Sequence, residues 1–156
     1  MKLKHITPIL NVSNISASLA WFENLGWNRC WTYNDGGMIE GAAGENADGP
    51  AGFAAVGCGE CEIFLCRNGQ GARDGRLPQQ AGDDNTGGVW MSWWLPTPAD
   101  VNALHELALK HSATVTWPPT DEPWGVREFH LQHPDGHTFR VSAPLECEPP
   151  LASNSD

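Results

Sequence analysis

Apolar and polar positions along the 156-residue chain predict the same succession of elements twice. In the first half, an extended apolar segment over residues 6–12 precedes apolar residues at helical spacing over residues 15–25. Ser13 or Asn14 is suited to cap this helix, and Gly26 is suited to end it. Three short runs with strand character follow, over residues 28–33, 52–57 and 62–66.

The second half repeats this order. An apolar strand is expected over residues 89–95, and Pro96-Thr97-Pro98 forms a break before a helix over residues 99–111. Three more strands are expected over residues 114–117, 127–132 and 138–142. The repeat predicts an α+β fold in which tandem βαβββ modules form a curved mixed sheet. We assign the first module to residues 1–66, a linker rich in Gly, Gln and Asp to 67–88, the second module to 89–144 and a disordered tail to 145–156.

The last two expected strands and their turn carry the most specific motif. The chain contains Pro-Trp-Gly-Val-Arg-Glu-Phe over residues 123–129, and Pro134, Asp135 and Gly136 supply turn chemistry before the final strand. This hairpin resembles the last hairpin of the vicinal-oxygen-chelate superfamily, which includes glyoxalase I, extradiol dioxygenases and the bleomycin-resistance proteins. The resemblance covers about residues 5–143 and is strongest to the bleomycin-resistance branch, although this chain has the additional Val126. It implies two half-shell modules that enclose a cleft, paired between two chains of a dimer.

Composition argues for a folded protein and against one that binds nucleic acid. Hydrophobic residues make up 40% of the chain and charged residues 18%, which is typical of globular proteins. No apolar run approaches the roughly 18 residues of a membrane span, and the N-terminus has no signal-peptide core, so we expect a cytoplasmic protein without a membrane partner. The net charge of −10 would repel nucleic acid and attract a cationic ligand.

The five cysteines are an odd number in a chain without an export signal, so we expect reduced thiols. Cys58 and Cys61 have the spacing of a metal-binding or redox pair. No second pair of Cys or His lies nearby in the sequence, and the two cysteines stand in a Gly-rich turn between short apolar runs. A hairpin turn is therefore favoured over a zinc or redox site.

The resemblance also implies where a metal would bind. Metal-dependent relatives carry His, Gln or Glu at four strand positions that face the cleft. Counted from the motifs of each module, these positions are Thr7, Phe64, Trp90 and Arg140. Their side chains offer no carboxylate, imidazole or thiolate, and an arginine would repel the ion, so we expect neither a metal nor another cofactor. Shifted ligands are the alternative, and they would be His5, Glu62 and His130.

Other candidate catalytic groups are sparse. His133 and His137 flank the Asp135-Gly136 turn, and we expect both to be exposed to solvent. The chain has no Gly-x-Ser-x-Gly nucleophile elbow and no phosphate-binding Gly-x-x-x-x-Gly-Lys loop. We therefore expect no catalytic residue.

Eight tryptophans, against one tyrosine, make aromatic surface the most prominent candidate site. Trp21 and Trp27, on and after the first helix, are expected to be structural. Alternation along the fifth strand directs Trp90 and Trp94 to one face and Trp93 to the other. The cleft is therefore expected to be an aromatic slot for flat heteroaromatic or cationic groups. The candidate ligand-binding residues are Thr7, Trp31, Phe64, Trp90, Trp94, Trp117, Trp124 and Arg140.

Together these observations predict a metal-independent binding protein of the bleomycin-resistance type. It would sequester a cationic or aromatic antibiotic-like ligand and form a homodimer. Two other functions stay open. One is an enzyme of the same superfamily, a lyase, an isomerase or a dioxygenase, with an unknown substrate. The other is an interaction module whose cleft is filled by its own side chains.

Overall fold

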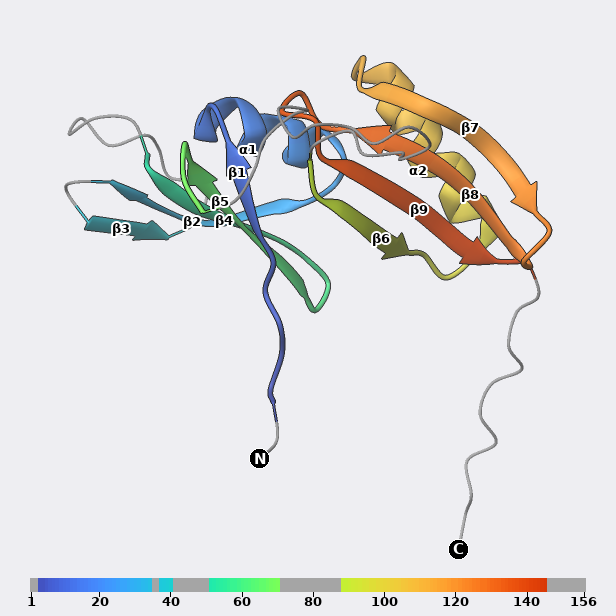
Figure 1. The fold of residues 1–156 in the computed structure, drawn as a ribbon, viewed down its shortest axis with the longest axis horizontal. Helices are drawn as coiled ribbons and strands as arrows, with labels where there is room; N and C mark the ends of the chain where they lie inside the picture. Colours follow the sequence, from blue (N-terminus) through green and yellow to red (C-terminus); the bar gives the residue numbers. More distant parts are fainter. Residues whose placement is uncertain (1–2, 35–36, 41–50, 71–87, 146–156) are drawn as a thin grey trace, which may run out of the picture.

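The two modules lie side by side, and each consists of one sheet with one helix (Figure 1). The computed structural model describes residues 3–34, 37–40, 51–70 and 88–145. The first module contains β1 (Ile9–Val12), α1 (Ile15–Asn24), β2 (Asn28–Asn34), β3 (Gly37–Glu40), β4 (Phe53–Cys58) and β5 (Cys61–Arg67). The second module contains β6 (Trp90–Trp94), α2 (Pro98–Lys110), β7 (Thr114–Glu122), β8 (Val126–Gln132) and β9 (Thr138–Pro144). Most of the predicted linker and nearly all of the predicted tail lie outside the described residues.

The strand order confirms the tandem repeat. The first sheet has the order β1-β5-β4-β2-β3 and the second has the order β6-β9-β8-β7. In each module the strand before the helix pairs in parallel with the last strand, and the other neighbours are antiparallel. The fold is therefore α+β with two mixed sheets, as predicted, although the sequence pattern misses β3 at the edge of the first sheet. Neither of the two helices in the described ranges is long and apolar enough to cross a membrane.

Both helices begin at capping residues that the sequence offers. Asn14 caps α1, because its side-chain oxygen accepts a hydrogen bond from a backbone N–H of the first turn at 3.0 Å. After α1, Gly26 adopts a φ of +87°, which favours glycine. At α2, Thr97 and Asp100 form a reciprocal capping box. Pro98 was predicted to lie before the helix, but it is the first helical residue. The N–H of a first helical residue has no partner within the helix, so a proline at this position loses no hydrogen bond.

β7 is longer than the sequence pattern predicts. The predicted strand ends at Trp117, but β7 continues through Pro118 and Pro119 to Glu122. β7 is the outer strand of the second sheet, and its pairing with β8 shifts register on both sides of Trp117. Prolines are tolerated there because an edge strand needs hydrogen bonds on one side only. The extension brings Glu122 onto the same sheet as the tryptophans of the second module.

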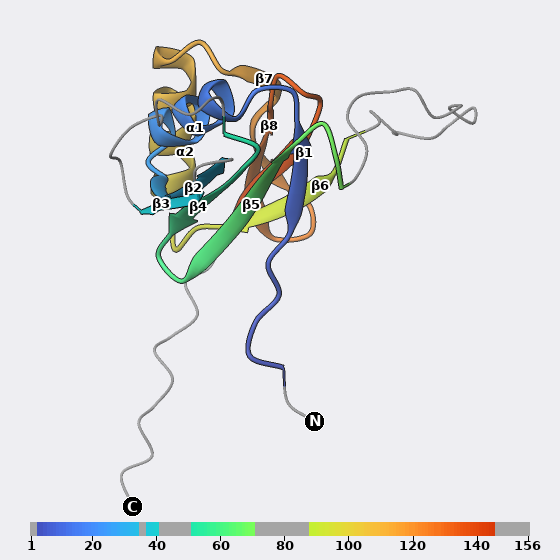
Figure 2. The same cartoon turned by 90° about the vertical axis from the view of Figure 1, so that its left-hand side faces the viewer.

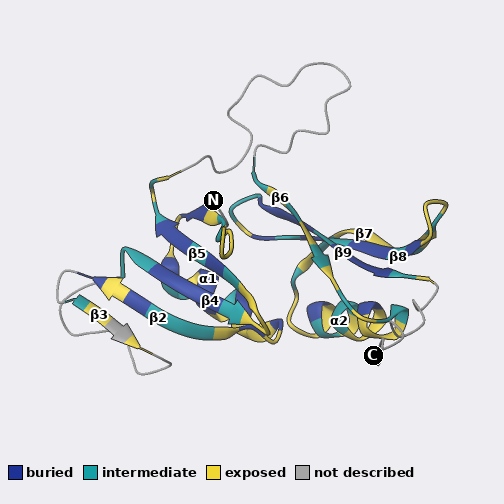
Figure 3. Ribbon diagram, turned by 90° about the horizontal axis from the view of Figure 1, so that it is seen from below, coloured by how far each residue is buried: buried dark blue, intermediate teal, exposed yellow. Residues whose placement is uncertain are grey.

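One hydrophobic core runs through both modules. Phe22 of α1 is fully buried, and its ring centroid lies 6.2 Å from that of Trp93 in β6. The Trp21 ring lies 5.6 Å from Phe139 in β9, and Trp27 lies 5.1 Å from Trp93. Trp93 therefore packs against the core, on the face of β6 opposite Trp90 and Trp94 as predicted, and the structural roles of Trp21 and Trp27 are confirmed. Figure 3 shows buried stretches in the central strands of both sheets.

The turn between β8 and β9 joins the second module to the first. Figure 2 shows this turn beside the end of β1. The backbone N–H of Ser13 donates to Asp135 Oδ2 at 2.9 Å. His137 Nδ1 accepts from the backbone N–H of Val89 at 3.1 Å, so Nε2 carries the proton and donates to the Asn11 carbonyl at 2.7 Å. A neutral histidine therefore links β1 to the start of the second module.

His133 and His137 are buried, with relative exposures of 2% and 0%, so the prediction that both are exposed is wrong. The turn packs against α1 instead of projecting into solvent, which a local pattern does not show. The His133 ring meets Trp21 edge-on at 4.9 Å, and its Nδ1 accepts from the Asp135 backbone N–H. Burial and the neighbouring His137 ring lower the pKa of His133 to about 4, despite the Asp135 carboxylate 3.7 Å away.

Candidate functional site

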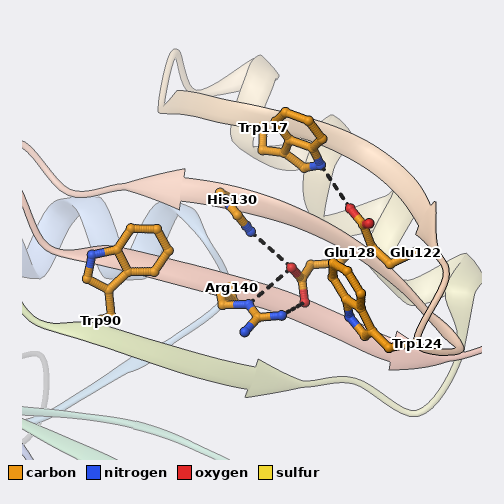
Figure 4. Close-up of a pocket in the computed structure, with 7 residues that line it drawn as sticks. All are labelled: Trp90, Trp117, Glu122, Trp124, Glu128, His130 and Arg140. Carbon is orange, nitrogen blue, oxygen red and sulfur yellow. Dashed lines mark hydrogen bonds and ion pairs between the residues drawn. The ribbon is translucent and has the colours of Figure 1, made fainter. Parts of the chain in front are cut away.

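The face of the second sheet opposite α2 carries an open pocket of about 390 Å³ (Figure 4). Side chains alternate along β8: Phe129 contacts His105 of α2, whereas Glu128 and His130 point to the other face. The residues that line the pocket are Trp90, Trp117, Glu122, Trp124, Glu128, His130 and Arg140. They come from all four strands of the sheet and from the turn between β7 and β8.

A hydrogen-bond network around a buried glutamate forms the floor of the pocket. The pairing of β8 with β9 places Glu128 opposite Ser142 and His130 opposite Arg140. Arg140 donates to the Glu128 carboxylate twice, from Nε to Oε1 at 3.0 Å and from Nη2 to Oε2 at 2.8 Å. Ser142 Oγ donates to Oε2 at 2.6 Å, and His130 Nε2 lies 3.0 Å from Oε1. These contacts hold a glutamate that is only 2% exposed.

The network keeps Glu128 charged. Burial by itself raises the pKa of this carboxyl group, but hydrogen bonds from Arg140, Ser142 and His130, together with the guanidinium charge, outweigh it and lower the pKa of Glu128. Glu128 and Arg140 are therefore a fixed ion pair at neutral pH. The Glu128 side chain is 3% exposed and that of Arg140 is 39% exposed, so the pair presents its guanidinium to the pocket.

Three exposed tryptophans surround this floor. The relative exposures are 42% for Trp90, 46% for Trp117 and 61% for Trp124. The His130 ring lies edge-on to Trp90 at 5.6 Å and tilted to Trp117 at 6.3 Å. Trp117 Nε1 donates to Glu122 Oε1 at 3.1 Å, which fixes the orientation of the indole. Exposed aromatic surface around a fixed polar centre is typical of a ligand-binding site.

The structure brings together half of the predicted ligand-binding residues. Those that line the pocket are Trp90, Trp117, Trp124 and Arg140. Trp31 and Phe64 lie on the first sheet, where their ring centroids are 5.2 Å apart. Thr7 precedes β1 and does not line the pocket. Trp94 is 65% exposed on β6 and points to the same face as Trp90, as predicted, but it is not a lining residue either.

Sequence reasoning missed most of the polar floor. It did not single out Glu122 or Glu128, and it suggested His130 only as a shifted metal ligand. A signal for Glu128 and His130 was available, because locating the turn at Asp135 sets the register of the hairpin. That register places both residues on the face that carries Arg140. No comparable signal exists for Glu122, which depends on the continuation of β7 through two prolines.

Comparison with known proteins identifies the family. The family model described as Glyoxalase/Bleomycin resistance protein/Dioxygenase superfamily matches residues 2–141. The chain belongs to this superfamily. No curated protein matches its sequence.

Solved structures share the fold of this superfamily member at low sequence identity. TioX from Micromonospora sp. ML1 is 17% identical over 92% of this chain and 100% of that chain, with a TM-score of 0.65. A glyoxalase/bleomycin resistance protein/dioxygenase from Nocardioides is 18% identical over 96% of this chain and 89% of that chain, with a TM-score of 0.59. A bleomycin resistance determinant encoded on the transposon Tn5 is 14% identical over 91% of this chain and 98% of that chain, with a TM-score of 0.56. At these identities the similarity establishes the fold and not the ligand.

The residues of this superfamily member do not fit a metal ion in the pocket. The carboxylate of Glu128 is already bonded to Arg140, whose positive charge faces the space that an ion would occupy. Within the described ranges, no three His, Cys, Asp or Glu side chains come together to hold a metal. Cys58 and Cys61 face each other across the β4–β5 turn without a disulfide, in the hairpin that the sequence predicts.

Proposed function

We propose that this superfamily member binds an aromatic small molecule in the pocket of the second sheet and holds it without altering it. The observation that carries the proposal is the set of three exposed indoles, of Trp90, Trp117 and Trp124, around a floor that is already internally bonded. Each stacked ring contributes roughly 1–3 kcal/mol. Glu128 is engaged by Arg140 and Ser142, so it is poorly suited to act as a general base.

The charge of the chain supports a ligand with a cationic group. The net charge is −10, and a negative field raises the local concentration of cations. Glu122 adds a carboxylate beside Trp117, and indole faces attract cations directly. We therefore infer a cationic, antibiotic-like aromatic ligand and a role in sequestering it, as in the bleomycin-resistance proteins that give the superfamily part of its name.

A homodimer is part of this proposal. α1 packs on the first sheet and α2 on the second, and each sheet has a face that its own helix does not cover (Figure 1). On the first sheet, Trp31, Phe53 and Phe64 form a partly buried aromatic cluster. If the first sheet of one protomer faces the pocket of its partner, this cluster closes the open side of the pocket. The cleft would then have aromatic walls on both sides.

Fluorescence titration tests the binding proposal. Bleomycin is added to the protein, and indole fluorescence is followed because a stacked heteroaromatic ring quenches it. Trp90→Ala is expected to weaken binding by about tenfold or more, which corresponds to the loss of one stacking contact. Trp94→Ala is the matched control, since Trp94 is exposed on the same face of β6 but does not line the pocket. Equal weakening by the two variants, or no quenching by bleomycin or other aromatic antibiotics, would contradict the proposal.

Metal content separates binding from the alternative function as an enzyme. We expect no stoichiometric ion in the purified protein, and no ion near Arg140 in crystals grown with added nickel or manganese. A bound ion in the pocket would instead favour a metal-dependent lyase, isomerase or dioxygenase.

Salt titration tests the role of charge in binding. The affinity for a cationic ligand should fall as added salt shortens the range of the protein's electric field to about 8 Å.

A further inference from the structure

The guanidinium of Arg140 has hydrogen-bond donors that the protein does not use. Nε and one hydrogen of Nη2 are directed to Glu128. Within the described part of the chain, no acceptor takes Nη1 or the second hydrogen of Nη2. Figure 4 shows the two bonds from Arg140 to Glu128. The side chain lines the pocket and is 39% exposed. These donors therefore face the space that a ligand would fill.

A purely apolar ring would displace water from these donors without offering them an acceptor. Stripping water from a charged donor and leaving it without an acceptor costs more than an ordinary hydrogen bond returns. A ligand that stacks on Trp90 or Trp117 lies beside Arg140, because all three line the same pocket. Such a ligand needs an acceptor atom at the edge of its ring.

The charges of the pocket decide which kind of acceptor fits. Glu122, Glu128 and Arg140 together carry one net negative charge, and the whole chain carries −10. A carboxylate or phosphate would be attracted by Arg140 but repelled by Glu122 and by the field of the chain. A neutral carbonyl oxygen avoids this repulsion, and its two lone pairs can accept from the guanidinium.

We propose that the ligand carries a neutral carbonyl group, an amide or a ketone, on its aromatic ring, and that this oxygen accepts a hydrogen bond from Arg140 Nη1. The inference rests on the proposed function and defines its ligand class as aromatic carbonyl compounds. Any cationic group lies at the other end of the ligand, toward Glu122 on β7, which is two strands away from Arg140 on β9. Arg140 orients the ring, and the indoles hold its faces.

Four probes with one ring system test the ligand class: 2-methylnaphthalene, 2-naphthamide, 2-naphthoate and 2-naphthylmethylamine. They carry an apolar group, a neutral acceptor, an anion and a cation. Each is titrated into isotope-labelled full-length protein, and the NMR signals of the pocket indole N–H groups and of Arg140 Nε–H are followed. We expect 2-naphthamide to bind about tenfold more tightly than 2-methylnaphthalene, the effect of one hydrogen bond to a charged group, and to shift the Arg140 signal. We expect 2-naphthoate to bind more weakly than the amide.

Two lysine variants make the test specific. Arg140→Lys keeps a positive charge beside Glu128 but loses the planar fork, so it should remove most of the advantage of the amide over 2-methylnaphthalene. Arg127→Lys is the matched control, because Arg127 contacts Asp121 and Asn102 on the opposite face of β8 and should leave that advantage unchanged.

The possible failures are distinguishable. If the amide and 2-methylnaphthalene bind equally, if the amine or the carboxylate binds most tightly, or if Arg140→Lys retains the advantage, the carbonyl inference is wrong while the aromatic-binding function stands. If no probe shifts a pocket indole signal up to its solubility limit, the proposed function fails and the inference fails with it.

Discussion

The buried imidazole of His133 is expected to make this protein less stable in mild acid. Burial, and then the neighbouring His137 ring, lower its pKa to about 4 in the folded state, and the Asp135 carboxylate offsets this only in part. In the unfolded chain a histidine has a pKa of about 6.5. Between these two values the unfolded chain takes up a proton that the folded protein does not. The free energy of unfolding therefore falls as the pH falls through this window.

The size of the effect follows from the two pKa values. Each pH unit inside the window lowers the free energy of unfolding by about 1.4 kcal/mol. From about pH 7 to about pH 5 the loss is about 2 kcal/mol, because protonation of the unfolded chain begins only near pH 6.5. The lowered pKa of Glu128 acts in a separate range, since the stability due to its ionised form is lost only below about pH 4.3, the unfolded value. Above about pH 5 the Glu128 carboxyl group therefore does not contribute, and comparison with a variant that lacks His133 gives the share of this histidine.

Urea unfolding of the wild type and of His133→Asn measures this difference. The asparagine Oδ1 can accept from the Asp135 N–H as His133 Nδ1 does, but the amide does not titrate. The variant loses the ring contact with Trp21 at every pH, so only the change between pH values is compared. Over this range we expect the wild type to lose about 2 kcal/mol more than the variant loses. His5→Asn, at an exposed histidine, should behave as the wild type. Parallel losses in the wild type and His133→Asn would refute the reasoning.

Three other predictions concern packing, capping and assembly. Gly88→Ala should lower the free energy of unfolding by about 2 kcal/mol or more, because a Cβ there would clash with the backbone carbonyl of Gly136. Gly52→Ala, with nothing within 4 Å of the added Cβ, is the control in urea unfolding. Thr97→Ala removes the capping box of α2 and should cost about 1 kcal/mol in the same assay, whereas Thr97→Ser should cost much less; equal losses would contradict the capping role. Light scattering at micromolar concentration should give twice the monomer mass of 16.9 kDa, and the monomer mass would count against the proposed dimer.

The fold could be predicted because the local signals agree with the tertiary structure. The Asn14 cap, the positive φ at Gly26 and the turn at Asp135 and Gly136 each form where the sequence indicates. β3 could not be predicted in this way. It has four residues, begins at Gly37, and is held in the sheet by pairing with β2 alone. Such a strand depends on its neighbour and has little propensity of its own.

The three tryptophans and Arg140 of the candidate site were named from the sequence, whereas Glu122 and Glu128 were missed. Period-2 alternation sorts the side chains of one strand between two faces, so Trp90 and Trp93 were separated correctly. Alternation does not show which sheet faces share a pocket, and Trp31 and Phe64 lie on the first sheet, away from Trp90. The burial of His133 could not be predicted for a similar reason. It depends on packing against α1, which lies more than a hundred residues earlier in the chain.

Two residues account for the difference between this pocket and a metal centre on the same scaffold. By resemblance, metal-dependent relatives carry ligands at the positions of Trp90 and Arg140. Here the arginine forms an ion pair with Glu128 on the adjacent strand, which neutralises a buried carboxylate that would otherwise attract a cation. The indole at Trp90 replaces a second donor with a stacking surface. The same hairpin also joins the modules through His137. In the proposed function, the pocket therefore offers a ligand the indole of Trp90 and the guanidinium of Arg140 in place of metal ligands.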